Sequence, residues 1–568
     1  MKTSSLRTKF FALIMIAVLV INVLLAAPQQ AFAQTRKPNI VFILVDDMDA
    51  DTIDRAPEQY ARHIKSLLID QGTSFSNYLV NVSLCCPSRT NILRGQYAHN
   101  TKLLTNSSNS NGGFPQAYSQ GLEKETIATS LQANGYRTAL MGKYLNGYPN
   151  KAPSDTYIPP GWTEWYSPME SGGQRKKYGN PYCQYNYVLN QNGKLVKYGN
   201  KEKDYGTDVY NGFAKDFIER SAKDGKPFFL YLAPFNIHGP YTPAKRYENL
   251  FPTSPENRAP RTRNFNEADV STKPQFIRGL EPLDLDQRST IDDNYRLRLR
   301  SLQSVDDAVK KLVDTLKEKG QLDNTYIILA SDNGYKQGIH RISSGKQSAY
   351  EEDIRLNLIV RGPGIPSGKK LPQLVGNTDF FPTFTDMAGV NPPKFVDGRS
   401  FLPLLKGTTP NPPKWRSAFL VEHKEDRKRQ LALENQAKLQ DKKEKECPDQ
   451  IGFPGQSELP NQKELQDQPD LQDQLELEDL SELESLRKKA QIPSIPTYQA
   501  IRTQDYTYVE YETGEKELYD IKKHPDQLEN LASTADPTLL KQLANRLNKL
   551  RTCQKDSCRA VEDQPFTP

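Results

Sequence analysis

The chain has few cysteines and, after residue 33, no long hydrophobic run. Only six of its 568 residues are cysteine, and two of these, Cys85 and Cys86, are adjacent. Adjacent cysteines do not easily close a disulfide on each other, and nothing near the pair completes a zinc-binding spacing. A bilayer-spanning helix needs about 20 consecutive apolar residues, which no segment beyond residue 33 supplies. The sequence therefore argues against a zinc site at the pair and against a membrane-spanning body.

The chain also lacks a strong excess of charge of one sign. The formal net charge is +6. Three positive charges, Lys2, Arg7 and Lys9, lie in the first 33 residues, which contain no acidic residue, so the remaining chain carries only +3. Nucleic-acid-binding proteins typically have a basic stripe interleaved with aromatic residues, and this sequence has none. We therefore expect no nucleic-acid partner.

Residues 1–33 have the parts of an export signal. The basic residues are followed by an apolar run over 10–27 and by Ala-Phe-Ala at 31–33, a small-x-small cleavage site. The run is long enough for an uncleaved anchor, but Asn22, Pro28 and the cleavage site favour removal. We predict a signal peptide over 1–33, a secreted or periplasmic location, and no stable membrane insertion after cleavage.

Disulfides persist outside the cytoplasm, so the remaining cysteines are candidates for pairing. Cys553 and Cys558, in RTCQKDSCR, are close enough to bridge each other. Cys183 and Cys447 either pair or stay free, and the sequence leaves this open.

Five short apolar runs, separated by helical stretches such as 294–319, predict the fold class. We expect an α/β fold with a mostly parallel sheet covered by helices on both faces, because the runs are continuous and rich in β-branched residues. The runs are PNIVFILV (38–45), RTALMG (137–142), PFFLYLA (227–233), NTYIILAS (324–331) and LNLIVRG (356–362).

Polar residues follow four of these runs: Asp46 and Asp47, Lys143, His238, and Asp332 with Asn333. Taken singly, Asp-Asn-Gly is a common turn and Asp-Asp a common helix cap. Their repetition instead predicts a shared crevice, because ligands gather beyond the carboxyl ends of parallel strands. The carboxylate and amide oxygens suit a hard divalent cation such as Ca²⁺ or Mg²⁺.

The surroundings of this predicted cation site are basic. With Lys143, Lys346, Arg89 and His238 around the cation, the pocket is strongly positive on a nearly neutral protein. Such a pocket suits a compact anion, which narrows the substrate to a phosphate, phosphonate or sulfate ester.

The stretch LCCPSRTNILRG, residues 84–95, holds the adjacent cysteines. Pro87 at a first helical position and Ser88 beside it indicate that a helix starts here. Cys85 would then lie near unpaired backbone N–H groups, which stabilise negative charge. The alternative from this stretch alone is a pair of buried cysteines that pack as small apolar residues.

Cys85-Cys86-Pro87-Ser88-Arg89, followed by Leu-Arg-Gly at 93–95, resembles the Cys-x-Pro-Ser-Arg signature of the sulfatases. The likeness covers nearly the whole mature chain and is strongest to the N-acetylglucosamine-6-sulfatase branch. It includes Gly142-Lys143, His238-Gly239-Pro240, SDNG at 331–334, Lys346, DGRSFLPLL from Asp397, and residues 506–532. It implies an alkaline-phosphatase-like fold: a large, mostly parallel sheet sandwiched by helices, with a small C-terminal α+β subdomain.

The resemblance also implies a mechanism. In this family the first cysteine of the signature becomes formylglycine (3-oxoalanine), here at Cys85, through a formylglycine-generating enzyme. The hydrated aldehyde would attack sulfur and then expel sulfate, with His238 as the acid for the departing alcohol. Arg89, Lys143 and Lys346 would stabilise the sulfuryl oxygens. The cation, Ca²⁺ with Mg²⁺ as alternative, would be held by Asp46, Asp47, Cys85, Asp332 and Asn333.

One position departs from the family pattern. Many sulfatases have Lys-x-His, but here Lys143 is followed by Tyr144, Leu145 and Asn146. The base of the second half-reaction is therefore open, and His340 or Lys336 in DNGYKQGIH are the candidates. Cys86 is expected to be structural.

The chain divides, by composition and resemblance, into a catalytic domain over 37–423, a charged low-complexity insertion over 424–495 and a C-terminal subdomain over 496–568. The insertion is rich in Lys, Glu, Gln and Asp, which favours solvated helix or disorder, with a partner-binding arm as the alternative. Loops 106–116 and 178–198 are candidates for substrate specificity.

The leading hypothesis is an exported, metal-dependent sulfatase that cleaves a sulfate monoester on a carbohydrate. The enzyme alternative is a phosphonate or phosphate ester hydrolase that uses the same site. The non-enzyme alternative is a sulfoglycan-binding pseudoenzyme in which Cys85 stays a thiol.

Overall fold

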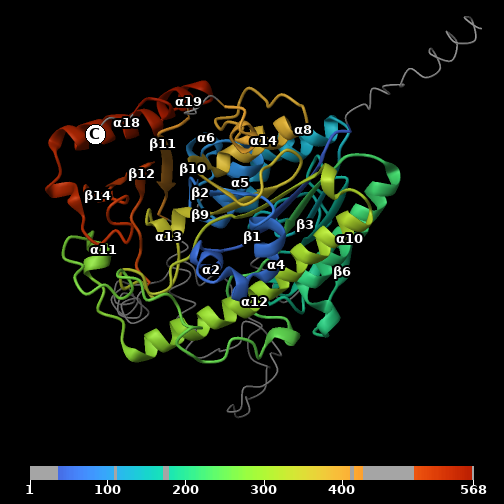
Figure 1. The fold of residues 1–568 in the computed structure, drawn as a ribbon, viewed down its shortest axis with the longest axis horizontal. Helices are drawn as coiled ribbons and strands as arrows, with labels where there is room; N and C mark the ends of the chain where they lie inside the picture. The colour runs from blue at the N-terminus through green and yellow to red at the C-terminus, as the bar shows by residue number, and fades with distance from the viewer. Residues whose placement is uncertain (1–35, 108–111, 171–177, 410–414, 426–491, 566–568) are drawn as a thin grey trace, which may run out of the picture. The chain divides into compact units, whose positions relative to one another are not determined.

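The computed structural model describes residues 36–107, 112–170, 178–409, 415–425 and 492–565, which Figure 1 draws in colour. The chain divides into residues 1–37 and a second unit, residues 38–568, which contains every helix and strand of the described residues. The predicted signal peptide, residues 1–33, lies outside the described residues. Among the described residues, no helix combines the length and the apolar character needed to cross a membrane.

A ten-stranded sheet forms the centre of the second unit, in the order β10-β2-β9-β8-β1-β7-β3-β4-β5-β6. The strands are β1 (Asn39–Val45), β2 (Thr73–Leu79), β3 (Arg137–Gly142), β4 (Glu164–Pro168), β5 (Val188–Gln191), β6 (Lys194–Lys197), β7 (Phe228–Ala233), β8 (Thr325–Ser331), β9 (Arg355–Arg361) and β10 (Lys369–Gly376).

All five apolar runs of the sequence are strands of this sheet. β8, β1, β7, β3 and β4 pair in parallel, so their carboxyl ends share one edge. β9 runs antiparallel to β8 and ends at the opposite edge. It is also the one run that no predicted site residue follows. The predicted α/β class and mostly parallel sheet are confirmed.

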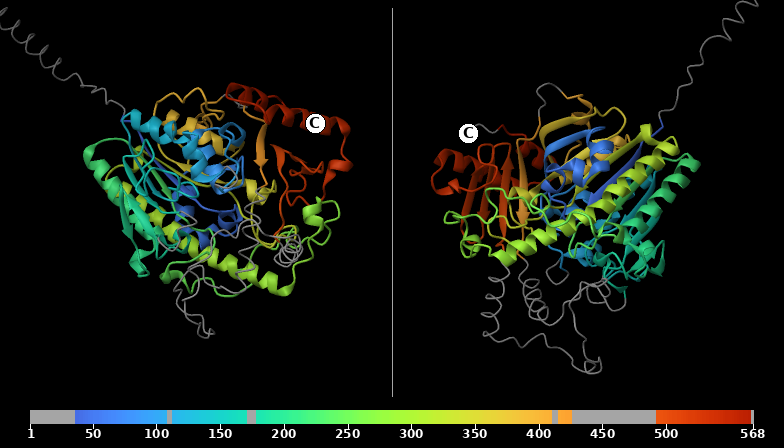
Figure 2. Two further views of the ribbon diagram at one scale, coloured as in Figure 1. Left: turned by 180° about the vertical axis from the view of Figure 1, so that it is seen from behind. Right: turned by 60° about the horizontal axis from the view of Figure 1, so that its bottom comes forward.

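Helices cover both faces of the sheet (Figures 1 and 2). The residues of β1 contribute alternately to the hydrophobic cores on these two faces. Ile40, Phe42 and Leu44 belong to the core on one face, whereas their neighbours Val41, Ile43 and Val45 belong to the core on the other. A strand buried on both sides must be apolar at every position, which produces the continuous runs.

The helices of the two layers pack with these two cores. Those that pack with the first core include α5 (Cys85–Arg94), α7 (Gly113–Ser119), α8 (Ile127–Ala133), α14 (Phe380–Met387) and α15 (Leu402–Lys406). Those that pack with the second include α4 (Arg62–Ile64), α10 (Gly206–Asp224) and α12 (Leu285–Glu318). Short helices complete the set: α2 (Asp51–Asp54), α3 (Pro57–Tyr60), α6 (Ala98–Thr101), α11 (Gln275–Arg278) and α13 (Glu351–Ile354).

Two helix starts differ from the sequence-based expectation. The helix expected over 294–319 begins earlier, at Leu285, because the Asp284 side chain accepts from the Gln287 amide and the Gln287 side chain accepts in return, a capping box. α5 begins at Cys85 rather than at Pro87. Pro87 is thus the third helical residue, where its missing N–H still costs no intrahelical bond.

A second, four-stranded antiparallel sheet forms the C-terminal part: β11 (Ala418–His423), β12 (Tyr498–Thr503), β13 (Tyr506–Tyr511) and β14 (Lys516–Asp520), with α18 (Pro537–Leu550) and α19 (Asp556–Glu562) beside it (Figure 1). This small sheet takes its first strand from the range assigned to the catalytic domain, because β11 pairs with β12. The predicted insertion therefore joins two adjacent strands; its residues 426–491 lie outside the described residues.

The cysteines follow the expectations where the structure describes them. Cys553 and Cys558 form a disulfide. Cys183 is disulfide-bonded, while Cys447 lies outside the described residues. Cys85 and Cys86 are free and buried. The prediction that Cys86 is structural is consistent with its position in the core under α5.

Candidate active site

The parallel strands bring most of the predicted site residues to one edge of the large sheet. Asp46 and Asp47 follow β1, Lys143 follows β3, and Asp332 with Asn333 follows β8. Cys85 is the first residue of α5, which points its N-terminus at this edge. We call Asp46, Asp47, Cys85, Arg89, Lys143, His238, Asp332, Asn333 and Lys346 the Cys85 cluster. Its carboxylates are almost completely buried.

Each carboxylate of the cluster has a basic partner. Lys143 Nζ donates to Asp46 Oδ2 at 2.7 Å, and Arg89 Nε donates to Asp332 Oδ2 at 2.8 Å. Arg89 Nη2 lies 3.8 Å from Asp46 Oδ1. Lys346 Nζ forms an ion pair with Asp47 Oδ1. Buried charges persist only when they are paired in this way.

Lys346 shows where a cation fits. Besides the Asp47 carboxylate, its ammonium contacts Cys85 Sγ at 2.9 Å and Asn333 Oδ1 at 3.4 Å. A positive group therefore already lies among these donors. Asp46, Asp47, Cys85 and His238 each offer one ligand atom, and the four atoms lie within 4.8 Å of one another. Two of the four atoms are carboxylate oxygens, the ligands that hard divalent ions prefer.

The metal ligands predicted from the sequence differ in their hydrogen-bond partners. Asp332 accepts a hydrogen bond from Arg89 Nε at Oδ2 and one from the Asp47 backbone N–H at Oδ1, the latter at 3.2 Å. Asn333 donates through Nδ2 to Asp47 Oδ1 at 2.6 Å, which leaves its Oδ1 facing Lys346. His238, predicted as an acid, also offers a ring nitrogen to this donor group. No local pattern indicated this, because His238 is five residues beyond the end of β7.

The local charges govern ionisation in the cluster. Burial opposes the charge on Asp46, but Lys143, His238, Arg89 and Lys346 together hold its pKa below the ordinary value. Burial raises the pKa of Asp332 to about 6 against the opposing effect of Arg89. Burial and the neighbouring Asp46 raise the pKa of the Cys85 thiol to about 12. An unmodified Cys85 would thus be protonated at neutral pH and a poor nucleophile.

His238 is the cluster member most open to solvent, with 29% of its side chain exposed. Its Nδ1 contacts the Gly239 carbonyl oxygen at 2.8 Å, and because a carbonyl only accepts, Nδ1 carries a proton. Nε2, 3.6 Å from Asp47 Oδ2, is the ring nitrogen that faces the cluster. The centroid of the His238 ring is 4.6 Å from the centroid of the Tyr182 ring.

Tyr182 is a site residue that the sequence did not single out by itself. Lys143 Nζ lies 5.0 Å from its ring centroid, so the ring packs against both Lys143 and His238. Its hydroxyl donates to Glu170, which also accepts from Asn146 Nδ2 at 2.9 Å. Tyr182 belongs to the predicted specificity loop 178–198. The other such loop also reaches the site, because Asn106 Oδ1 accepts from the Cys86 amide at 2.8 Å.

His340 and Lys336, the candidates for the second-step base, make their contacts elsewhere. The buried His340 bonds through Nδ1 to Glu267 and packs against the Tyr350 ring at 4.3 Å. Lys336 pairs with Asp353. Ile339 forms a bridge with Phe265, and His340 adopts φ 51°. Neither residue has a contact that supports the predicted role.

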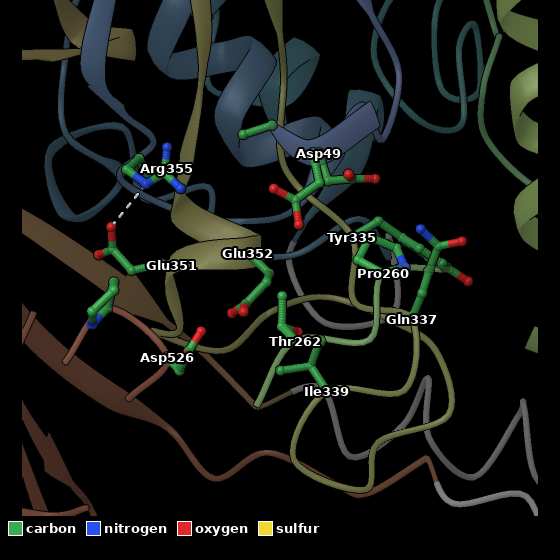
Figure 3. A pocket seen from close by; sticks show the side chains of 13 residues that line it. Asp49, Pro260, Thr262, Tyr335, Gln337, Ile339, Glu351, Glu352, Arg355 and Asp526 are labelled. Atoms are coloured by element: carbon green, nitrogen blue, oxygen red, sulfur yellow. Dashed lines mark hydrogen bonds and ion pairs between the residues drawn. The ribbon is translucent and has the colours of Figure 1, made fainter. Parts of the chain in front are cut away.

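A separate pocket of about 140 Å³ is lined by thirteen described residues, none of which belongs to the cluster (Figure 3). Five are acidic: Asp49, Asp51, Glu351, Glu352 and Asp526. Arg355 is the one basic side chain among the thirteen, and it pairs with Glu351 at 3.1 Å. Burial, followed by the charge of Asp49, raises the pKa of Asp51 to about 6; burial raises that of Glu352 to about 7. We call this the acidic pocket.

Comparison with known proteins adds sequence relatives. A family model described as Sulfatase matches residues 38–390, a range that contains the whole Cys85 cluster. The chain is 33% identical over 542 residues to N-acetylglucosamine-6-sulfatase of Homo sapiens, covering 93% of this chain and 87% of that protein. It is 36% identical over 419 residues to the extracellular sulfatase SULF-1 homolog of Drosophila melanogaster, covering 72% of this chain and 35% of that protein.

Solved structures share the fold. One, described as BT4656 in complex with its substrate D-glucosamine-2-N,6-O-disulfate, matches with a TM-score of 0.61 at 21% identity. The match covers 94% of this chain and 100% of the other. It therefore includes both the large sheet and the small C-terminal sheet.

Proposed function

Because the chain belongs to the sulfatase family, whose members hydrolyse sulfuric esters, we propose that it removes sulfate from a sulfated carbohydrate resembling N-acetylglucosamine 6-sulfate. The observation that carries the proposal is the Cys85 cluster: a buried thiol at a helix N-terminus, beside two carboxylates and three cations. The substrate class comes from the relatives, since human N-acetylglucosamine-6-sulfatase aligns along 93% of the chain.

In the proposed mechanism Cys85 acts as formylglycine. Hydrated, this aldehyde supplies a hydroxyl that attacks sulfur and a second hydroxyl that later expels sulfate, a route closed to a cysteine or serine ester. The thiol itself is disfavoured as nucleophile because burial raises its pKa to about 12.

The basic residues of the cluster take the charge of the sulfuryl oxygens. Lys143, Lys346 and Arg89 are buried and held by carboxylates, so they stay charged. His238 acts as the acid in its doubly protonated form, because Nδ1 keeps its own proton on the Gly239 carbonyl oxygen. Nε2 of the partly exposed ring then gives its proton to the departing alcohol, and the Asp47 carboxylate 3.6 Å away favours this charged form.

The cation site is proposed for Ca²⁺, with Mg²⁺ as the alternative. Asp46, Asp47, Asn333 and the modified residue 85 would hold the ion, with Asp332 fixed by Arg89 behind them. When bound, such an ion makes a coordinated hydroxyl more acidic and polarises the sulfate oxygens. We assign no base for the second half-reaction to His340 or Lys336, because their side chains are held by Glu267 and Asp353.

We further propose that the protein is exported through a signal peptide over 1–33 and matured by a formylglycine-generating enzyme. A secreted or periplasmic location fits the disulfide between Cys553 and Cys558. It also fits the relatives, which include an extracellular sulfatase.

A substrate panel tests the proposal. Protein co-produced with a formylglycine-generating enzyme would be assayed on N-acetylglucosamine 6-sulfate, other sulfated mono- and disaccharides, an aryl sulfate and an aryl phosphonate. We expect the highest kcat/KM on a 6-sulfated glucosamine derivative. A preference for the phosphonate would favour the phosphonate hydrolase, and the absence of all turnover with an unmodified Cys85 in the native host would favour the sulfoglycan-binding pseudoenzyme.

A further inference from the structure

The loop that carries Lys346 is held from the small C-terminal sheet. Gln347, the next residue, adopts φ 85°, a left-handed conformation that costs energy for a residue with a Cβ. Such a conformation persists only where neighbouring groups fix it. One of these groups is Tyr498, whose hydroxyl donates to the Gln347 carbonyl oxygen at 3.0 Å.

Tyr498 begins β12, is fully buried, and also reaches the segment that leads into Cys85. Its hydroxyl interacts with the side chain of Ser83, two residues before Cys85. Ser83 Oγ in turn donates to the Ser348 carbonyl oxygen at 3.3 Å. The hydroxyl therefore lies between the segment that precedes Cys85 and the segment that follows Lys346.

The first strand of the same small sheet fixes the approach to Cys85. The Glu422 amide in β11 donates to the Asn81 carbonyl oxygen at 2.6 Å, and Asn81 Nδ2 donates to the Leu420 carbonyl oxygen at 3.0 Å. Asn81 is thus attached to β11, while residues 347–348 are attached to β12 and Ser83. Between these two attachments, Lys346 Nζ meets Cys85 Sγ at 2.9 Å.

We propose that Tyr498 is a positioning residue that sets the placement of Lys346 against residue 85, so that the C-terminal sheet is part of the catalytic machinery. The kinetic part of this inference rests on the proposed function, whereas the structural part does not. The loop that carries Lys346 is held by Asp353, which accepts the Ser348 amide at 2.8 Å, and by Tyr498, so the small sheet contributes to the distance between Lys346 and residue 85. A misplacement of about 1 Å lowers rates strongly in preorganised sites.

The variant Tyr498→Phe removes the hydroxyl but keeps the ring, which packs 5.5 Å from the Tyr511 ring. We expect kcat on an aryl sulfate to fall about tenfold with a smaller change in KM, because a displaced Lys346 stabilises the transition state less. The matched control is Tyr508→Phe in β13 of the same sheet. Its hydroxyl donates to Glu510 at 2.8 Å, away from the Lys346 loop, and we expect less than a twofold change.

A double-mutant cycle separates positioning from general destabilisation. If Tyr498 acts through Lys346, adding Tyr498→Phe to Lys346→Met should change kcat by less than twofold. Full additivity of the two losses would overturn the proposal, as would unchanged kcat in Tyr498→Phe.

Hydrogen exchange gives a readout that does not require turnover. Amides of residues 345–350 should exchange faster in Tyr498→Phe and remain as in wild type in Tyr508→Phe. Unchanged exchange in this segment contradicts the proposal even if the wild type is an active sulfatase. Faster exchange in a protein without sulfatase activity would sustain the positioning contact and refute only the proposed function.

Discussion

Asp46 in the Cys85 cluster and Asp51 in the acidic pocket are both carboxylates, but their pKa values shift in opposite directions. Both lie beyond the end of β1: Asp46 and Asp47 enter the cluster, and Asp49 and Asp51 line the pocket (Figure 3). In the cluster, Lys143, Lys346 and Arg89 outweigh burial and keep the pKa of Asp46 low. In the pocket, burial raises the pKa values of Asp51 and Glu352.

The difference lies in geometry as much as in charge. Four donor atoms of the cluster converge within 4.8 Å, and no other such group of His, Cys, Asp or Glu occurs in the described part of the chain. The carboxylates of the pocket do not converge in this way. An acidic crevice alone therefore does not make a metal site; convergent oxygen atoms with balancing cations do.

The largest effect is expected at residue 85. Cys85→Ala should lower sulfate ester hydrolysis by roughly four orders of magnitude or more, since it removes the attacking group. The circular dichroism spectrum and the melting temperature should change little, because alanine fits the same buried helix start. Appreciable activity in this variant would refute the mechanism.

Metal removal should have the next largest effect. After dialysis against a chelator, kcat should fall by about two orders of magnitude and recover on addition of Ca²⁺ or Mg²⁺. Added Ca²⁺ should also raise the melting temperature of the wild type but not of Asp46→Asn, which lacks one carboxylate of the cage. Glu352→Gln in the acidic pocket is the control and should keep the calcium response. Loss of the calcium response in Glu352→Gln would indicate that the ion binds in the acidic pocket and not in the cluster.

A smaller kinetic effect is expected at His340, which directly follows Ile339 of the acidic pocket. His340→Gln should keep kcat within about threefold of wild type and lower the melting temperature, because the ring is buried against Tyr350 and bonded to Glu267. Activity and thermal denaturation would be measured on the same sample. A loss of kcat by about a hundredfold with an unchanged melting temperature would reinstate His340 as the second-step base.

The smallest effect concerns stability alone. The pKa of Glu352 is about 7 in the folded chain against an ordinary 4.5, so between these values the folded state binds more protons and stability falls as pH rises. Glu352→Gln cannot ionise and keeps a group that accepts from Asn264. It should be more stable than wild type by about 3 kcal/mol at pH 8, with little difference at pH 4. Urea denaturation at both pH values measures this; an equal difference at both would exclude the proposed ionisation.

The structure brings the predicted strand-end residues together, whereas the loop residues His340 and Lys336 have other partners. Asp46, Lys143 and Asp332 directly follow apolar runs, so the parallel sheet alone brings them together. His340 does not follow a strand, and its position depends on backbone turns and on its bond to Glu267, which lies 73 residues away. Tyr182 likewise reaches His238 through loop packing that no local pattern encodes.

Pairing between distant segments explains the other differences. β11 carries an ordinary apolar pattern, and only its pairing with β12, beyond the long insertion, places it in the small sheet. The start of α12 was present in the sequence as Asp284 and Gln287, three residues apart, the spacing of a capping box.

Mass spectrometry of the peptide that contains residue 85, from protein made in its native host, tests the account most directly. An aldehyde at that position, lost in Cys85→Ala and trapped by a hydrazine reagent, is the predicted result. A quantitatively alkylatable thiol at position 85 in protein that still hydrolyses sulfate esters would contradict it.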